Sequence, residues 1–146
     1  MREIFRKTET DGCGCGGACG FGGVSRLMQW PVQIGRVPAK AEFFDGARLL
    51  IAADCAAYAC VDFHERFMKD RITLIGCMKQ DRQETAEKLA AIFAENDIRE
   101  VLVAQMSVPC CSELTKTVEK ALNLSGKQLP IKTAVVTPFG SVRESK

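Results

Sequence analysis

Short, mainly apolar runs recur along the chain after residue 47. They predict strands at Arg48–Ala53, Ile72–Gly76, Val101–Ala104 and Ile131–Val136. A strand with one face in water would alternate apolar and polar residues, and these runs do not. The pattern therefore favours a parallel sheet that is covered on both faces.

Segments of helical periodicity separate these strands. One is expected over Tyr58–Met68, a second begins where Asp81 and Glu84 form a capping box, and a third lies beyond Ser112. The apolar faces of the last two consist of Ala86, Leu89, Ala90, Phe93, Leu114, Val118, Ala121 and Leu122. This alternation predicts a single three-layer, Rossmann-like α/β domain with a mainly parallel sheet of about four strands.

The chain is expected to divide into two parts. Residues 1–29 form a segment rich in glycine and cysteine, which includes GCGCGGACGFGG and has neither helical nor strand periodicity. Residues 30–146 are expected to form the α/β domain, with an irregular connector over Trp30–Phe44 that leads into the first strand. A chain of 146 residues is long enough for one domain with its own core.

Charge and hydropathy exclude several classes of protein. The net charge is +2, from 20 basic and 18 acidic residues. The chain has no basic stripe of the kind that a nucleic-acid-binding protein needs. No apolar stretch has the length of a membrane span, and the first residues lack the apolar core of a signal peptide. We therefore expect a cytoplasmic protein, in which 8 cysteines indicate metal binding or redox chemistry rather than disulfides.

Four cysteines follow three successive predicted strands: Cys55, Cys77, Cys110 and Cys111. Right-handed crossovers bring the carboxyl ends of parallel strands to one edge, where α/β folds bind their ligands. Four thiolates suit a [4Fe-4S] cluster or tetrahedral zinc, and the C-x₂-C pairs of structural zinc sites are absent here. The helix beyond Ser112 would direct N–H groups and its positive end toward such a cluster.

A second cluster is a weaker expectation. Cys13, Cys15 and Cys19 lie among glycines that permit tight turns, and Cys60 would be their fourth ligand. The alternatives are that Cys60 is a buried helix residue, or that three cysteines hold a cluster with one open iron. His64 follows Cys60 by four residues, which places both on one face of the expected helix. It would ligate metal or hydrogen-bond to a cluster, although a lone histidine is more often satisfied by a backbone carbonyl.

The core resembles a group of ferredoxin-type iron–sulfur-binding proteins of anaerobes. The matching strings are Trp30-Pro31-Val32-Gln33, Leu50–Cys55, Asp62-Phe63-His64, Leu74–Cys77 and Val108–Cys111. This resemblance implies iron–sulfur binding and electron transfer, with Cys55, Cys77, Cys110 and Cys111 as the ligands. Members of that group often carry a C-x₂-C-x₂-C-x₃-C ferredoxin domain ahead of this one, whereas only the glycine-rich segment stands here.

The leading functional hypothesis is an electron-transfer module without catalytic residues of its own. Its partner would be a ferredoxin or an oxidoreductase subunit, and the chain would act as an oligomer or as part of a complex. One alternative is a cluster enzyme with an open iron. The others are a zinc or soft-metal thiolate binder and a sulfur carrier that uses Cys110 and Cys111.

Overall fold

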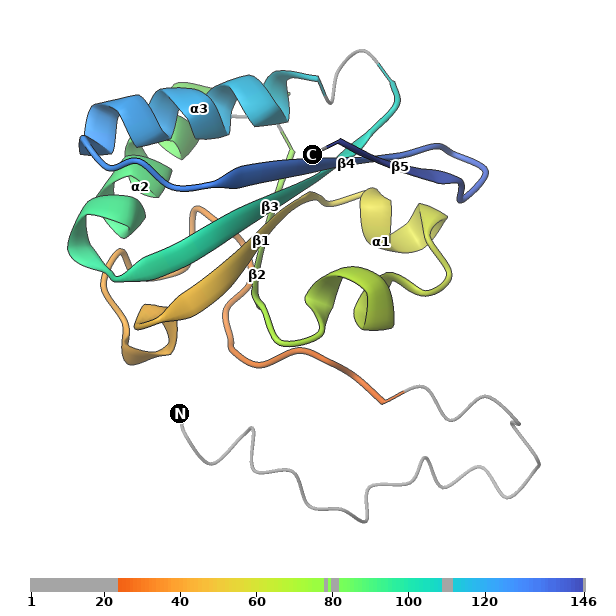
Figure 1. The fold of residues 1–146 in the computed structure, drawn as a ribbon, viewed down its shortest axis with the longest axis horizontal. Coiled ribbons are helices and arrows are strands. Elements are labelled where there is room, and N and C mark those ends of the chain that lie inside the picture. The colour runs from red at the N-terminus through yellow and green to blue at the C-terminus, as the bar shows by residue number, and fades with distance from the viewer. Residues whose placement is uncertain (1–23, 78, 80–81, 109–111, 146) are drawn as a thin grey trace.

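A five-stranded sheet forms the centre of the molecule in the computed structural model, which describes residues 24–77, 79, 82–108 and 112–145. The strands are β1 (Ala47–Ala53), β2 (Ile72–Gly76), β3 (Ile98–Met106), β4 (Ile131–Val136) and β5 (Val142–Ser145). Their order is β2-β1-β3-β4-β5, and only β5 runs antiparallel to its neighbour (Figure 1). The predicted Rossmann-like α/β class is confirmed, and the count of about four strands is corrected by the short fifth one.

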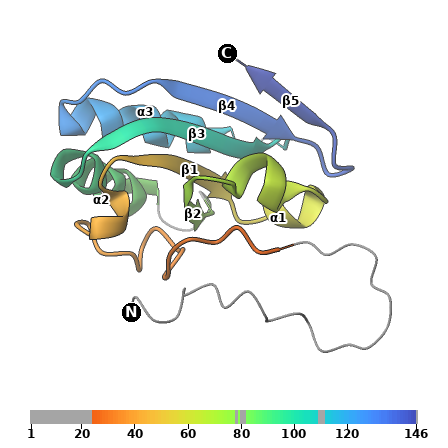
Figure 2. The ribbon, with the colours of Figure 1, turned by 60° about the horizontal axis from the view of Figure 1, so that its bottom comes forward.

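The helices lie on both faces of the sheet and complete the three layers. The longer ones, α2 (Arg82–Glu95) and α3 (Glu113–Ser125), pack side by side on one face. The short α1 (Ala56–Ala59) and the π-helical turn η2 (His64–Met68) cover the opposite face (Figure 2). The connection from β1 to β2 moves across the sheet in the opposite direction to the connections from β2 to β3 and from β3 to β4. Because such connections are right-handed, the helical segments between β1 and β2 lie on the face opposite to α2 and α3.

The inner strands carry the core. Leu49, Leu50, Ile51 and Ala52 are all fully buried, although successive side chains of a strand point to opposite faces. This burial on both faces explains why the strands read as uninterrupted apolar runs. A short 3₁₀ turn, η1 (Glu42–Phe44), packs Phe44 under the start of β1.

The predicted helix over Tyr58–Met68 is wrong as a single element. The chain leaves helical geometry at Cys60, whose φ of −102° and ψ of 111° are extended, and it resumes as η2. Ala56, Cys60, Phe63 and Phe67 are nevertheless all buried. The helical spacing of these apolar residues therefore reflects which side chains enter the core, and not a continuous helix.

The connector before β1 closes the outer edge of β2. The side-chain amide of Gln29 donates to the Thr73 carbonyl and accepts from the Thr73 N–H at 3.3 Å. Two residues along the strand, the Ile75 N–H donates to Val32 at 2.9 Å and the Ile75 carbonyl accepts from Ile34 at 3.0 Å. These contacts satisfy peptide groups that an edge strand would otherwise present to another chain.

We predict that Gln29→Ala lowers the free energy of unfolding by about 1–3 kcal/mol, because it leaves both peptide groups of Thr73 without a partner in a buried place. Urea denaturation followed by circular dichroism measures the change. The matched control is Gln33→Ala, because the Gln33 side chain is exposed and only its backbone takes part in the edge contacts. Equal losses in the two variants would contradict the assigned role of Gln29.

Candidate functional site

Two of the predicted ligands, Cys55 and Cys77, lie at the carboxyl ends of neighbouring strands. Ala53 at the end of β1 pairs with Gly76 at the end of β2, and the Asp54 N–H continues the ladder to the Gly76 carbonyl at 3.3 Å. Adjacent strands lie about 4.8 Å apart. The structure therefore brings these two cysteines, separated by 22 positions in the sequence (77 − 55), to one edge of the sheet.

The third strand of the predicted site also ends at this edge. Ala104 of β3 pairs with Ala52 of β1, and β3 continues to Met106, after which the Ser107 N–H donates to the Val136 carbonyl at 2.8 Å. The strand order reverses between β1 and β3, which is where such folds form their binding crevice. Cys110 and Cys111 follow β3 but lie outside the described residues, as do Cys13, Cys15 and Cys19.

The two edge cysteines have different surroundings. Cys55 is exposed, directly precedes α1, and its thiol donates to Asp54 Oδ1 at 3.3 Å. Cys77 is half-buried and lies in the wall of a pocket of about 480 Å³. A thiol at the surface and a thiol in a cavity wall are both within reach of an incoming metal or cluster.

The pocket beside Cys77 is formed by four segments of the chain. The connector, the ends of β1 and β2, and the first turns of α2 contribute Gln33, Ile34, Gly35, Arg36, Asp54, Ile75, Gly76, Cys77, Glu84, Thr85 and Lys88. Its volume is in the range of small-molecule sites. The sequence gives no signal for this pocket, because the connector residues join it only through their pairing with β2.

Cys60 has a different environment from Cys55 and Cys77. It is buried among the core residues that include Phe63 and Phe67, and its thiol donates to Asp62 Oδ1 at 3.1 Å. Burial, followed by this hydrogen bond to Asp62, raises the pKa of the Cys60 thiol. The structure therefore stabilises the protonated thiol, whereas ligation requires the thiolate.

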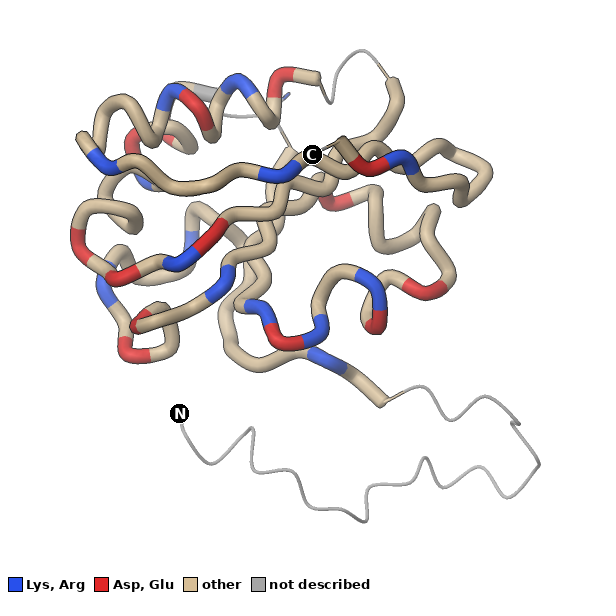
Figure 3. The backbone as a smooth tube through the Cα atoms, in the orientation of Figure 1, with Lys and Arg blue, Asp and Glu red and all other residues tan. Residues whose placement is uncertain are grey.

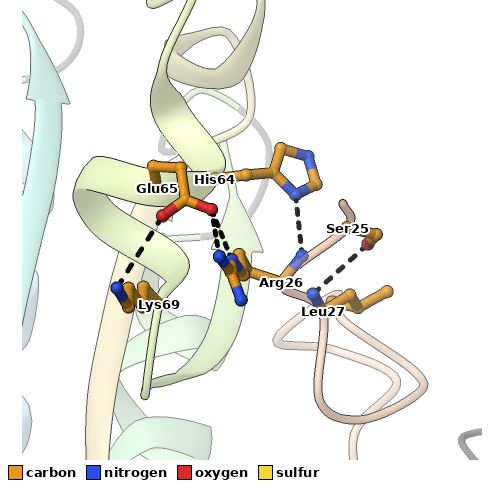
Figure 4. Close-up of polar contacts among 6 residues, drawn as sticks. All are labelled: Ser25, Arg26, Leu27, His64, Glu65 and Lys69. Carbon is orange, nitrogen blue, oxygen red and sulfur yellow. Dashed lines mark hydrogen bonds and ion pairs between the residues drawn. The ribbon is translucent and has the colours of Figure 1, made fainter. Parts of the chain in front are cut away.

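His64 is held by the residues that lead into the domain. Its Nδ1 accepts a hydrogen bond from the Arg26 N–H at 3.2 Å, and the Arg26 guanidinium pairs with Glu65, which also lies 3.9 Å from Lys69 (Figure 4). The neutral ring then carries its proton on Nε2. The expectation that Cys60 and His64 share a helix face is wrong, because the helix breaks between them and leaves His64 exposed.

Within the described residues, no three side chains among histidine, cysteine, aspartate and glutamate gather closely enough to hold a metal ion. That part of the chain includes two of the four predicted core ligands, Cys55 and Cys77. None of its helices has the length and apolar character needed to cross a membrane.

Comparison with known proteins identifies the fold family. Residues 41–146 match the family described as Rossmann-like domain. An uncharacterized protein of Archaeoglobus fulgidus is 39% identical over 120 residues, which cover 82% of this chain and 84% of that protein. No solved structure matches the chain.

We predict that iodoacetamide modifies Cys55 of the metal-free native protein much faster than Cys60. Cys55 is exposed, whereas Cys60 is buried and its raised pKa keeps a smaller fraction of it as the reactive thiolate. Because this pKa is raised, modification of Cys60 requires either a higher pH or unfolding in guanidinium chloride. Peptide mass spectrometry after timed quenching measures both rates, and equal native rates would contradict the assigned burial of Cys60.

Proposed function

The chain belongs to the Rossmann-like domain family, and from this premise we propose that it is an iron–sulfur protein that transfers electrons. Cys55, Cys77, Cys110 and Cys111 would hold one [4Fe-4S] cluster at the carboxyl edge of the sheet. The main support is the placement of Cys55 and Cys77 within two residues of the paired ends of β1 and β2. The sequence after β3 supplies the two remaining thiols.

The described residues fit such a cluster in the chemistry of their donor atoms. The two thiols at this edge are accessible or half-accessible, and Cys60, which is neither, lies in the core. The helix α3 begins at Glu113, two residues after Cys111, and its N-terminal end would favour the negative charge of thiolates. When bound, the cluster would supply one-electron transfer, and its potential would depend on hydrogen bonds and solvent exposure at this edge.

The residues around the proposed cluster site favour electron transfer over acid–base catalysis. His64 is the chain's one histidine, and its Nδ1 already accepts a hydrogen bond from the Arg26 backbone. Asp54, the carboxylate next to Cys55, accepts a hydrogen bond from the Cys55 thiol. We expect the protein to work in the cytoplasm with a ferredoxin or an oxidoreductase subunit as its partner.

The pocket beside Cys77 supports a second candidate function. A volume of about 480 Å³ next to a ligand cysteine would admit a small molecule to the cluster. The chain would then be a cluster enzyme with an open iron rather than a carrier of electrons. Turnover of a substrate by the loaded protein, without any protein partner, would distinguish this candidate from the first.

We predict that protein purified without oxygen is coloured and contains about four irons and about four acid-labile sulfides per chain, since one cubane contains four of each. About eight irons would indicate that Cys13, Cys15, Cys19 and Cys60 hold a second cluster. Visible absorbance with iron, sulfide and zinc analysis measures the content. A colourless protein that contains zinc and no sulfide would contradict the proposal.

Cys77→Ser is expected to remove most of the iron and the visible absorbance, because a serine oxygen is a poor replacement for a thiolate at a cluster. The matched control is Cys60→Ala, which should retain the cluster at the sheet edge because Cys60 is buried in the core. Circular dichroism confirms that both variants fold. Unchanged iron in Cys77→Ser would contradict the ligand assignment, and a halved iron content in Cys60→Ala would assign Cys60 to a second cluster.

A further inference from the structure

Among the residues that the structure describes, three large apolar side chains near the cysteine edge are almost completely exposed. Tyr58 is 94% exposed, Val61 104% and Phe139 96%, whereas the other exposed large apolar residues in the described ranges are between 52% and 58% exposed. Single apolar residues on a surface are ordinary, but a contiguous apolar group commonly marks an interaction site. We call these three residues the α1–turn patch.

The three residues come from segments that lie side by side. Tyr58 is in α1, Val61 follows it, and Phe139 is in the turn between β4 and β5. Gly140 in that turn has a φ of +89°, and a Cβ placed on it would lie only 2.9 Å from the Ala59 carbonyl oxygen. The turn therefore packs directly on the end of α1, and both views of the ribbon show the two segments together (Figures 1 and 2).

The α1–turn patch is adjacent to the proposed cluster. The Tyr58 N–H donates to the carbonyl of Cys55 at 3.2 Å, so the first turn of α1 joins the patch to a proposed ligand. A docked protein at this place would lie beside the carboxyl edge of the sheet. Electron transfer between proteins requires such proximity, because its rate falls steeply with the distance between the redox centres.

The segments that carry the patch, residues 54–63 and 137–142, are acidic. They contain no lysine or arginine, and their charged residues, Asp54 and Asp62, are exposed. Arg143, which follows the second segment, is also exposed, and Figure 3 shows basic and acidic positions together on β5. Arg66, which follows on η2, pairs with Glu144 at 3.4 Å. A cluster held by four thiolates would add further negative charge at this edge.

We propose that the α1–turn patch is the docking surface for an electron-transfer partner that presents an apolar centre ringed by lysine or arginine. This inference rests on the proposed function. Two aromatic side chains and a valine would bury roughly 500 Å² on this side, given about 150–250 Å² for each aromatic. A contact of that size matches transient redox encounters, which bury less than about 1,200 Å² in total, better than it matches a permanent dimer.

The electron transfer at this surface is a one-electron exchange. The reduced cluster loses one electron, and the oxidised centre of the partner gains it. No bond forms or breaks, and no proton has to move. The residues of the patch would contribute only contact and orientation, so they are not catalytic residues.

Binding without electron transfer gives the first test. Ferricytochrome c, a small basic haem protein, serves as the probe and is titrated into the oxidised, ¹⁵N-labelled, cluster-loaded protein at low salt. We expect weak binding, with chemical-shift changes at α1 and the β4–β5 turn that decrease as salt is raised. Shift changes confined to other surfaces would overturn the proposal.

Kinetics give the second test, with Tyr58→Ser/Val61→Ser/Phe139→Ser as the variant. After reduction with dithionite, the second-order rate of cytochrome c reduction in a stopped-flow instrument should fall at least tenfold. Leu124→Ser, at a 58% exposed apolar residue of α3, is the control and should keep the wild-type rate. An unchanged rate in the triple variant would overturn the proposal.

Two further measurements distinguish a failure of the docking proposal from a failure of the proposed function. Iron and sulfide content of every variant shows whether a cluster is present, so a wild-type protein without one refutes the proposed function rather than the docking surface. Light scattering after gel filtration gives the oligomeric state. A wild-type dimer that the triple variant dissociates would overturn the proposal by showing that a second copy covers the patch.

Discussion

Parallel pairing of β1 with both β2 and β3 is the interaction from which the rest of the architecture follows. Because the three strands run in one direction, each must be followed by a crossover that carries the chain back to the opposite end. The residues that follow each strand therefore leave from a common edge. Cys55, Cys77 and the pocket at the start of α2 all lie at this edge for that reason.

The two faces of the sheet are covered by helices of very different size. On one face α2 and α3 provide 14 and 13 residues and pack on each other. On the other, α1 and η2 are short, and the Cys60 side chain helps to fix them by entering the core between them. Short elements cannot bury all of their own apolar side chains, which explains how Tyr58 and Val61 remain exposed on an otherwise well-packed domain.

The sequence was sufficient to locate β1 to β4, because each of these strands contains a run of apolar residues. The bounds of β2 and β4 agree with the prediction to the residue, and β3 extends further at both ends through Arg99, Glu100 and Gln105. The strand β5 was missed, because three of its four residues are exposed and polar. Periodicity alone could not show the break at Cys60, since the same side chains enter the core with or without a continuous helix.

The site was predictable to a similar extent. Strand ends locate Cys55 and Cys77, because topology determines where a chain leaves a parallel sheet. Tertiary contacts determine the rest: the pocket wall at Gln33 and Arg36, and the packing of the β4–β5 turn against α1, depend on segments that meet only in the folded chain. No local sequence pattern predicts these contacts between distant segments.

The closed edge of β2 has a consequence for where the folding unit begins. The family match starts at residue 41, yet Gln29, Val32 and Ile34 complete the hydrogen bonding of Thr73 and Ile75. A chain cut to the matched range would expose an apolar strand with unpaired peptide groups, which is the usual starting point for aggregation through strand addition. The connector that contains Gln29, Val32 and Ile34 thus protects the domain from aggregation through the edge of β2, apart from any role in binding.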